Sequence, residues 1–254
     1  MLTIPCFDEE KRLDARHIDA LLEDPRIDVL LVDDGSRDNT LAKLREIGAA
    51  RPTRVQVHAM PQNGGKAEAV RTGLRAAIDG GAAIVGYVDA DFATPAIEVR
   101  RMLDELERTG AEVVIGSRVA RLGAEVKRSA QRHYMGRLFA TSAALVLGLR
   151  VYDTQCGAKL FRVGPALIAA LAEPFSSRWA FDVELLGRLT SPSPAGPGLT
   201  ERQLLEVPLR QWHDVGGSKL GPRAMVRAGT DVLRLGARVA RVGRRGFFPD
   251  GTGH

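Results

Sequence analysis

The sequence predicts an α/β protein with a mostly parallel central sheet flanked by helices. Short β-branched runs alternate with longer segments of helical character, and this alternation is typical of strands joined by crossover helices. Acidic residues follow several of these runs, where the ligand crevice of a parallel sheet lies. The 254-residue chain is also 44% hydrophobic, so it can bury a substantial core and is neither a disordered chain nor a collagen.

The predicted elements alternate in order along the chain. Strands are expected just before Asp8 and at five further runs: Ile27–Val32, Val55–Val57, Ala83–Val88, Val113–Ile115 and Leu204–Leu209. Helices are expected from near Pro95 and over three further segments: Asp38–Arg51, Lys66–Asp79 and Val183–Leu189. The Pro/Gly/Ser-rich segment Thr190–Leu199 is the one evident linker, so a single large domain fits this pattern.

Three acidic clusters follow predicted strands. They are Asp8–Glu10 after the first strand, Asp33–Asp34 after the second, and Asp89 with Asp91 after the fourth. Because the carboxyl ends of parallel strands meet at one edge of the sheet, these carboxylates are expected to form one site.

The strongest of these motifs is Asp89-Ala90-Asp91, which lies between a buried strand and the helix beginning near Pro95. Two carboxylates one residue apart can hold a divalent cation, and hard oxygen ligands suit Mg²⁺ or Mn²⁺, which bridge a diphosphate. The alternative is an acidic turn that caps the following helix.

Two glycine turns add to this picture. In Val32–Ser36 a carboxylate at the strand end can accept hydrogen bonds from a base or ribose, although Ser36 or Asp38 can equally serve as a helix N-cap. In Asn63–Lys66 a glycine turn, a helix N-terminus and a lysine converge, which predicts an anion site. The spacing is not that of a P-loop, and a simple capped helix start is the alternative.

Taken together, the ordered motifs resemble those of the family 2 glycosyltransferases, which have the GT-A fold. The motifs that carry this resemblance are Ile4–Glu10, Val32–Ser36, Asn63–Lys66, Asp89–Asp91 and Gly116–Arg118. Three later segments are similar to the dolichyl-phosphate β-glucosyltransferase branch: Asp153–Phe161, Trp179–Leu186 and Gly217–Leu220. The resemblance spans about residues 1–221, which are expected to form the catalytic domain, and residues 222–254 a basic amphipathic helix with a short tail.

The resemblance implies a metal-dependent, inverting hexosyltransferase that moves glucose from UDP-glucose to a polyprenyl phosphate such as dolichyl or undecaprenyl phosphate. It implies Mg²⁺ or Mn²⁺ as cofactor, held by Asp89 and Asp91. The implied nucleotide-sugar-binding residues are Pro5, Phe7, Glu9, Asp33, Asp34, Lys66, Asp89, Ala90, Arg118 and His213. The implied catalytic residues are Asp89, Asp91, Arg118, Asp182 and Lys219.

The acceptor decides whether a general base is needed. A phosphate monoester is already ionised near neutral pH, because its second pKa is about 6, so it needs no base. A hydroxyl acceptor would need a carboxylate to take its proton, and Asp182 is the first candidate. A same-fold enzyme with such an acceptor, or with GDP-mannose as donor, is the alternative function, and a helix cap is the alternative role of Asp182.

Some positions depart from the family pattern. Asp8 stands where the family usually has Asn, and Ala93 replaces a polar side chain that adds a metal ligand in related mannosyl-phosphate enzymes. His213 stands where those enzymes have an arginine that reaches the phosphate, and the alternative is a rim residue after a strand. The cationic contacts would then depend more on Arg118 and Lys219.

The sequence predicts no membrane span. Its longest apolar stretch, Ala143–Leu149, is far shorter than the roughly 18 to 20 residues that cross a bilayer, and Met1 is not followed by a signal-peptide pattern. Cys6 and Cys156 lie far apart without metal-ligand spacing, which favours a reducing compartment. The expected location is the cytoplasm, with attachment to the inner face of the membrane left open.

The C-terminal segment offers a means of attachment. Residues 201–254 carry ten basic and five acidic residues, so the whole net charge of +5 lies there. At about 100° per residue, six arginines share one stripe of a helix: Arg223, Arg227, Arg234, Arg238, Arg241 and Arg245. Apolar residues including Leu233 and Leu235 lie opposite, which suits an anionic membrane surface, although the helix can equally dock on the domain by its apolar face.

Basic segments of the chain allow two further interpretations. The segment Arg128–Leu149 can form a second interfacial helix or a buried one under an acceptor groove. An arginine-rich module that binds nucleic acid is disfavoured, because only 5% of the residues are aromatic and no basic platform with aromatic residues is present.

Overall fold

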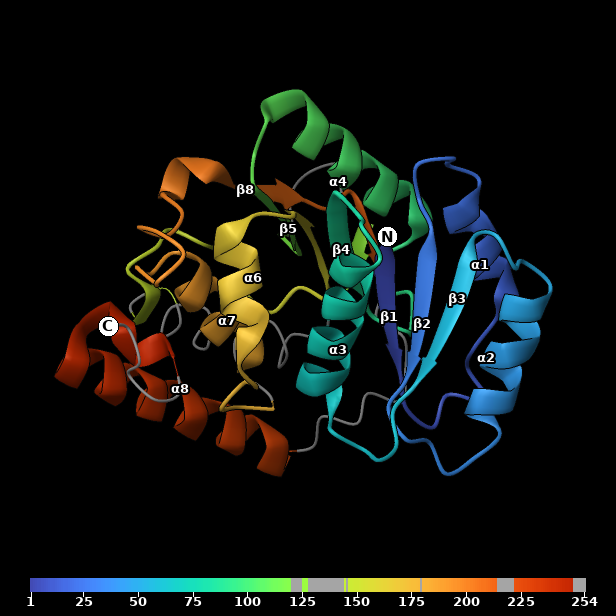
Figure 1. Cartoon of the computed structure of the whole chain (residues 1–254), viewed down its shortest axis with the longest axis horizontal. Helices are drawn as coiled ribbons and strands as arrows, with labels where there is room; N and C mark the ends of the chain where they lie inside the picture. The colour runs from blue at the N-terminus through green and yellow to red at the C-terminus, as the bar shows by residue number, and fades with distance from the viewer. Residues whose placement is uncertain (120–124, 128–143, 145, 179, 214–221, 249–254) are drawn as a thin grey trace.

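A seven-stranded sheet forms the centre of the molecule, with the strand order β3-β2-β1-β4-β7-β5-β8 (Figure 1). The computed structural model describes residues 1–119, 125–127, 144, 146–178, 180–213 and 222–248. The strands are β1 (Leu2–Cys6), β2 (Val29–Asp33), β3 (Val55–Ala59), β4 (Ile84–Val88), β5 (Val113–Ser117), β7 (Ala158–Arg162) and β8 (Leu204–Pro208).

The sheet is mostly parallel, as the sequence predicts. β1 pairs in parallel with β2 and β4, β2 with β3, and β5 with β8. All residues of β2 and of β5 are buried, as is usual for strands that have helices on both faces. β7 alone is antiparallel to its two neighbours, β4 and β5, and it was not among the predicted strands.

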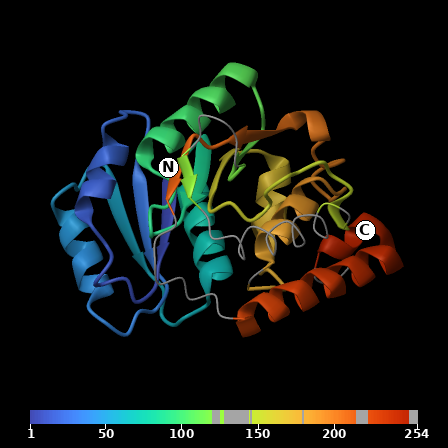
Figure 2. The same cartoon turned by 180° about the vertical axis from the view of Figure 1, so that it is seen from behind.

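Helices cover both faces of the sheet. One face carries α1 (Ala15–Leu22), α2 (Thr40–Ala49) and α4 (Ala96–Thr109), which share one core cluster. The other carries α3 (Lys66–Asp79), α6 (Pro165–Ala172), α7 (Phe181–Leu189) and α8 (Pro222–Val242), which share a second cluster. Figure 2 shows α1 and α4 on the face that is turned away in Figure 1.

One two-stranded pair and two 3₁₀ turns complete the fold. The short strands β6 (Glu125–Lys127) and β9 (Gln211–His213) pair in parallel outside the main sheet. Two 3₁₀ turns, η1 (Glu201–Gln203) and η2 (Gly243–Phe247), follow the linker and α8. No described helix is long and apolar enough to cross a bilayer.

Most predicted elements are present, with different ends. The helix expected over Asp38–Arg51 begins only at Thr40, because the Asp38 carboxylate accepts the Thr40 backbone N–H at 3.0 Å and forms a turn there. The segment Arg128–Leu149 lies mostly outside the described residues; of it, Leu147 and Leu149 are buried in the second core cluster.

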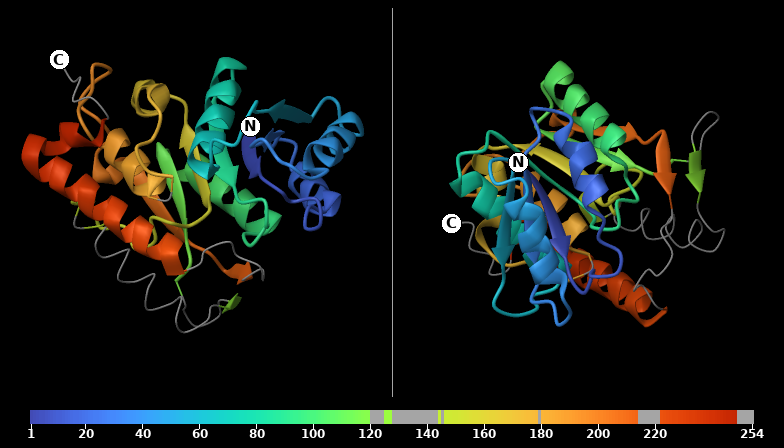
Figure 3. Two further views of the ribbon diagram at one scale, coloured as in Figure 1. Left: turned by 90° about the horizontal axis from the view of Figure 1, so that it is seen from below. Right: turned by 90° about the vertical axis from the view of Figure 1, so that its right-hand side faces the viewer.

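α8 is docked on the domain by its apolar face, one of the two interpretations that the sequence left open. Val232 and Leu235 are buried in the core cluster of α6 and α7, whereas Arg241 is exposed. Figures 1 and 3 show α8 along the half of the molecule that carries α6 and α7, away from α1 and α2. Leu233 was placed with the apolar residues opposite the arginine stripe. It is 69% exposed, because it lies toward the edge of the apolar face of α8.

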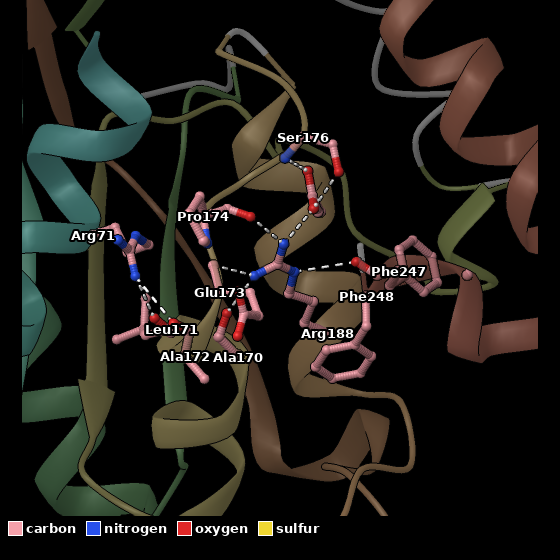
Figure 4. A network of polar contacts seen from close by, with 12 residues as sticks. Arg71, Ala170, Leu171, Ala172, Glu173, Pro174, Ser176, Arg188, Phe247 and Phe248 are labelled. Carbon is pink, nitrogen blue, oxygen red and sulfur yellow. Dashed lines mark hydrogen bonds and ion pairs between the residues drawn. The ribbon is translucent and has the colours of Figure 1, made fainter. Parts of the chain in front are cut away.

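A buried arginine joins this C-terminal part to the rest of the chain. Arg188 on α7 is only 1% exposed, and its guanidinium pairs with Glu184 at 2.6 Å and donates to the Phe247 carbonyl at 3.1 Å (Figure 4). The same group donates to three carbonyls at the end of α6 and just beyond it: Ala170, Glu173 and Pro174. Burial lowers the pKa of Arg188. The negative charge of Glu184 opposes that shift, so the ion pair keeps the arginine charged.

Candidate functional site

The three acidic clusters follow three neighbouring strands. β2, β1 and β4 lie side by side in the sheet, so their carboxyl ends share one edge. The sequence-based expectation that these strand ends are neighbours is therefore confirmed. In Figure 1 the arrowheads of β1 and β2 point to the edge from which α3 begins.

Lys66 and Asp89 form the central contact of this edge. Lys66 is the first residue of α3 and Asp89 directly follows β4; the Lys66 ammonium lies 2.6 Å from Oδ1 of Asp89. Their side chains are 39% and 34% exposed, so the pair is open to solvent on one side. Burial alone would lower the pKa of Lys66, but attraction to Asp89 and Asp182 outweighs it and raises that pKa.

Asp91 places a second carboxylate beside the first. Its Oδ1 accepts the Ala93 backbone N–H at 3.1 Å. Burial and repulsion by Asp89 together raise the pKa of Asp91, so a bound cation would relieve an unfavourable concentration of negative charge.

The donor set at this edge fits a magnesium or manganese ion. Mg²⁺ is usually bound by one or two protein carboxylates, with substrate phosphates and water as the other ligands. Asp89 and Asp91 supply that number, and the described residues contain no cluster of three or more metal-binding side chains. Oδ1 of Asp33 on β2 is also buried without a hydrogen-bond partner among the described residues.

Gly157 fits closely against the Asp89 carboxylate. A Cβ atom at Gly157 would lie 2.1 Å from Oδ2 of Asp89, so only glycine leaves room for that carboxylate. The Gly157 carbonyl also accepts the Asp89 backbone N–H at 3.0 Å. Gly157 lies within a motif of the sequence resemblance, but its contact with Asp89 was not predicted.

Asp34 organises the glycine turn that precedes Lys66. Its Oδ1 accepts the Gly64 N–H at 2.7 Å, and its Oδ2 accepts the Gly65 N–H at 2.9 Å and the Asn63 amide at 3.0 Å. Burial raises the pKa of Asp34, although these hydrogen bonds oppose the shift. These contacts give Asp34 a structural role in the turn, and neighbouring Asp33 accepts the Ser36 N–H at 3.3 Å.

Arg178, which the sequence did not single out, holds the opposite side of the same turn. Its Nε donates to the Gly64 carbonyl at 3.1 Å and its NH2 group donates to the Asn63 carbonyl at 3.3 Å. A Cβ at Gly65, whose φ is +86°, would lie 2.8 Å from the Arg178 Nε. The turn is thus held between an aspartate that accepts its N–H groups and an arginine that donates to its carbonyls.

Arg118 is held in place by Asp153. Its Nε and NH2 groups donate to the two Asp153 oxygens at 2.7 and 2.8 Å. Glu206 in turn accepts the Asp153 N–H at 2.7 Å, and the Trp212 ring lies 5.6 Å from the guanidinium. Burial would lower the pKa of Arg118, but Asp153 outweighs it and raises that pKa. Arg118 therefore remains charged at the end of β5.

Asp182 is buried behind the site. Its Oδ1 accepts from the Lys159 ammonium at 2.5 Å and from the Tyr87 hydroxyl. Lys159 is fully buried on β7, and its charge explains why this strand was missed, since a lysine is rarely found inside a sheet. The pairing of Asp182 with a buried lysine does not favour it as a general base for a hydroxyl acceptor.

The other candidate residues lie around this centre. Glu9 is buried and pairs with Arg12 at 2.5 Å, and Ala90 is buried between the two aspartates. His213 on β9 is exposed, and its backbone N–H donates to the Ala93 carbonyl at 3.1 Å, so it lies beside the Asp89–Asp91 turn. Pro5 and Phe7 are half-buried at the end of β1. Lys219 lies outside the described residues.

Comparison with known proteins assigns the family. The model of glycosyl transferase family 2 matches residues 2–166, which include all the strands described above except β8 and β9 and carry Lys66, Asp89 and Asp91. The chain belongs to glycosyl transferase family 2. The resemblance inferred from the sequence motifs is therefore confirmed.

Two relatives of this glycosyltransferase are named for dolichyl phosphate and for polyprenol. Dolichyl-phosphate beta-glucosyltransferase of Saccharomyces cerevisiae is 31% identical over 242 residues, which cover 86% of this chain and 68% of the yeast protein. Polyprenol monophosphomannose synthase of Mycolicibacterium smegmatis is 28% identical over 164 residues, which cover 65% of this chain and 62% of that protein.

Solved structures similar to this glycosyltransferase confirm the predicted GT-A fold. Glucosyl-3-phosphoglycerate synthase from Mycobacterium tuberculosis, in complex with UDP, matches with a TM-score of 0.64 at 19% identity and covers 98% of this chain and 80% of that one. The same synthase with Mg²⁺ and UDP matches with a TM-score of 0.60 at 18% identity over 92% of this chain and 77% of that one.

Proposed function

We propose that this chain is a metal-dependent hexosyltransferase that moves a hexose from a nucleotide sugar to a polyprenyl phosphate. The observation that carries the proposal is the group formed by Asp89, Asp91 and Lys66 at one edge of the sheet. It combines two carboxylates for a divalent cation with an ammonium group for a diphosphate. A nucleotide sugar needs both, because its leaving group is a nucleoside diphosphate.

The residues around this edge of the sheet would have different roles in binding the donor. Asp89 and Asp91 would hold Mg²⁺ or Mn²⁺, which when bound offsets the charge of the departing diphosphate. Lys66 stands at the N-terminus of a 14-residue helix, where an anion is also favoured by the helix dipole. Asp34 and Arg178 hold the backbone of the glycine turn, so the position of the Lys66 backbone is set before the donor binds.

A phosphate acceptor suits this arrangement better than a hydroxyl acceptor. An ionised phosphate oxygen can attack the sugar without a general base, since the second pKa of a phosphate monoester is about 6. The candidate base, Asp182, is paired with Lys159 and Tyr87 instead. Arg118 and, from the sequence resemblance, Lys219 are the cations we assign to the acceptor phosphate or the diphosphate.

We prefer UDP-glucose as the donor. The support is the segments Asp153–Phe161 and Trp179–Leu186, together with the 31% identity to a dolichyl-phosphate beta-glucosyltransferase. The similar mycobacterial protein is named as a monophosphomannose synthase, so the identity of the donor has to be measured directly.

Transfer assays test the proposal. UDP-glucose, GDP-mannose and UDP-N-acetylglucosamine are each supplied with a short polyprenyl phosphate and either Mg²⁺ or Mn²⁺, and lipid-linked sugar is measured. We expect transfer from UDP-glucose, lost by more than about 100-fold in Asp91→Ala because a metal ligand is removed. Asp104→Ala, at a 62%-exposed site on α4, is the matched control and should keep full activity. Absence of lipid-linked sugar with all three donors would refute the acceptor assignment.

We also propose that the outward face of α8 meets anionic lipid and places the enzyme on the cytoplasmic surface of a membrane. Arg234 has an 82%-exposed side chain, Arg241 is exposed, and Leu233 is 69% exposed. Basic residues beside an exposed leucine suit a headgroup layer, where each contributes about 1 kcal/mol. Arg238 contributes less, because it donates to the carbonyls of Gly246 and Phe248.

Vesicle co-sedimentation tests the lipid contact. The double variant Arg234→Gln/Arg241→Gln should bind phosphatidylglycerol-containing vesicles roughly 30-fold more weakly than the wild type, from two contributions of about 1 kcal/mol each. Arg16→Gln/Arg108→Gln, which removes two exposed charges from α1 and α4, is the control. Equal loss in both pairs, or no loss in either, would rule out a specific role of α8.

A further inference from the structure

Lys66 and Asp89 are paired with each other in this structure, but in the proposed donor complex they have different partners. Asp89 would hold the divalent cation and Lys66 the diphosphate. The Lys66 ammonium lies 2.6 Å from Oδ1 of Asp89, the first carboxylate of the acidic pair. A carboxylate oxygen in such contact with an ammonium is less available to a cation, and the ammonium is equally less available to a phosphate.

Neighbouring charges do not substitute for Lys66 in this contact. Arg118 is bound to both oxygens of Asp153, and Arg178 is bound to the backbone of the glycine turn. Asp182 and Asp91 also attract Lys66, and Asp182 is itself paired with Lys159. Of the described ion pairs, the one that involves Asp89 is therefore with Lys66.

The lysine is free to exchange partners. Its side chain is 39% exposed and its ammonium lies 5.8 Å from the Phe181 ring centre, so the flexible stem can swing without breaking a buried hydrogen bond. Its backbone, by contrast, is held by the turn that Asp34 and Arg178 fix. The ammonium can thus move from Asp89 toward a diphosphate at the start of α3 while the main chain stays in place.

We propose that Lys66 couples the binding of the donor to the binding of the metal. Without a donor, Lys66 neutralises Asp89 and weakens its affinity for a divalent cation. A bound diphosphate draws Lys66 away, and Asp89 then joins Asp91 as a cation ligand. The coupling disfavours a metal-loaded site without donor, and it rests on the proposed function, because it takes a nucleoside diphosphate and a divalent cation as the ligands.

Linkage gives the size of the expected effect. A coupling between two sites commonly changes affinity by about 5- to 150-fold, and it acts equally in both directions. We therefore expect UDP to tighten Mn²⁺ binding about tenfold or more in the wild type, and Mn²⁺ to tighten UDP binding by the same factor.

Binding measurements without turnover test this coupling. Free Mn²⁺ is measured by electron paramagnetic resonance with the full chain, alone and saturated with UDP, and a parallel series uses GDP. The variants are Lys66→Met, which removes the charge, and Lys66→Arg, which keeps it. Arg108→Met removes a charge from an exposed pair on α4 and is the matched control. Thermal unfolding of each variant confirms that it is folded.

The expected result separates the two variants. Lys66→Met should bind Mn²⁺ about tenfold more tightly than the wild type in the absence of nucleotide, and UDP should then tighten Mn²⁺ binding by a smaller factor than in the wild type. Lys66→Arg and Arg108→Met should behave like the wild type.

The opposite result is equally clear. If Lys66→Met binds Mn²⁺ no more tightly than the wild type without nucleotide, or if UDP and GDP leave Mn²⁺ affinity unchanged in the wild type, the coupling is refuted. Nucleotide binding that persists in those experiments would leave the proposed function standing. Failure of the wild type to bind either nucleotide would refute the proposed function as well.

Discussion

At the scale of residues, Gly157 leaves no space for a side chain beside the Asp89 carboxylate of the candidate site. Gly157→Ala would place a methyl group 2.1 Å from the Asp89 carboxylate, which would have to move. We expect kcat/KM for transfer to fall about 100-fold, since a displacement of about 1 Å at a reacting centre has that effect. Gly164→Ala is the matched control, because Gly164 has an extended backbone and open space around it. Equal activity of the two variants would contradict the proposed use of Asp89.

The two cysteine thiols should be inert in the native protein. Burial raises the pKa of Cys156 to about 11, and burial with the nearby carboxylates raises that of Cys6 still further. Roughly one thousandth of Cys156 is thiolate at about pH 8, so an aromatic disulfide reagent should react with neither residue until denaturant is added. Rapid labelling of the native protein at that pH would contradict the buried placement of both thiols.

At the scale of elements, the Arg188 network fixes α6, α7 and the C-terminal turn to one another. Arg188→Met leaves Glu184 charged and unpaired in the interior and leaves the carbonyls around it without their donor. We expect the free energy of unfolding to fall by about 3 to 5 kcal/mol, as when one partner of a buried pair is removed.

Urea unfolding measures the effect against a surface control. Arg108 and Glu105 form an exposed pair on α4, and Arg108→Met should change the free energy of unfolding by less than about 1 kcal/mol. A similar small change for Arg188→Met would show that the interior pair is replaceable by an apolar side chain.

At the scale of the whole molecule, α8 and η2 are part of the core. Removing residues 222–254 would uncover the surface on which Val232, Leu235 and Phe247 are buried. Each such side chain contributes about 1.5 to 3 kcal/mol, so we expect the free energy of unfolding to fall by about 5 kcal/mol or more. A tail that served only to contact lipid would leave unfolding unchanged, and urea titration of the two chain lengths distinguishes these outcomes.

Most strands of the main sheet were predictable from the sequence, and β7 was the exception. The runs that became β2, β4 and β5 are apolar and β-branched, which is a local property of each segment. β7 was missed because Lys159 interrupts its apolar pattern, and a charge inside a sheet is tolerated only when a distant partner neutralises it. That partner, Asp182, lies on another element.

The candidate site was predictable in its composition but less so in its contacts. Asp89, Asp91 and Lys66 were identified because strand ends and helix starts are marked by residue type and spacing. The role of Arg178 was not, since an exposed arginine in a loop carries no local signal. Asp34 was expected to bind nucleotide, which stays a prediction; its hydrogen bonds to the glycine turn were not foreseen.

The sequence by itself determined the family, the alternation of strands and helices, and the acidic strand ends, because each depends on residues close together in the chain. The tertiary structure alone decided which charges meet. Lys66 lies against Asp89, Asp182 against Lys159, and the apolar face of α8 against α6 and α7. Such pairings depend on how distant segments pack, and burial makes an unpaired charge costly, so the fold selects one partner among many that the sequence allows.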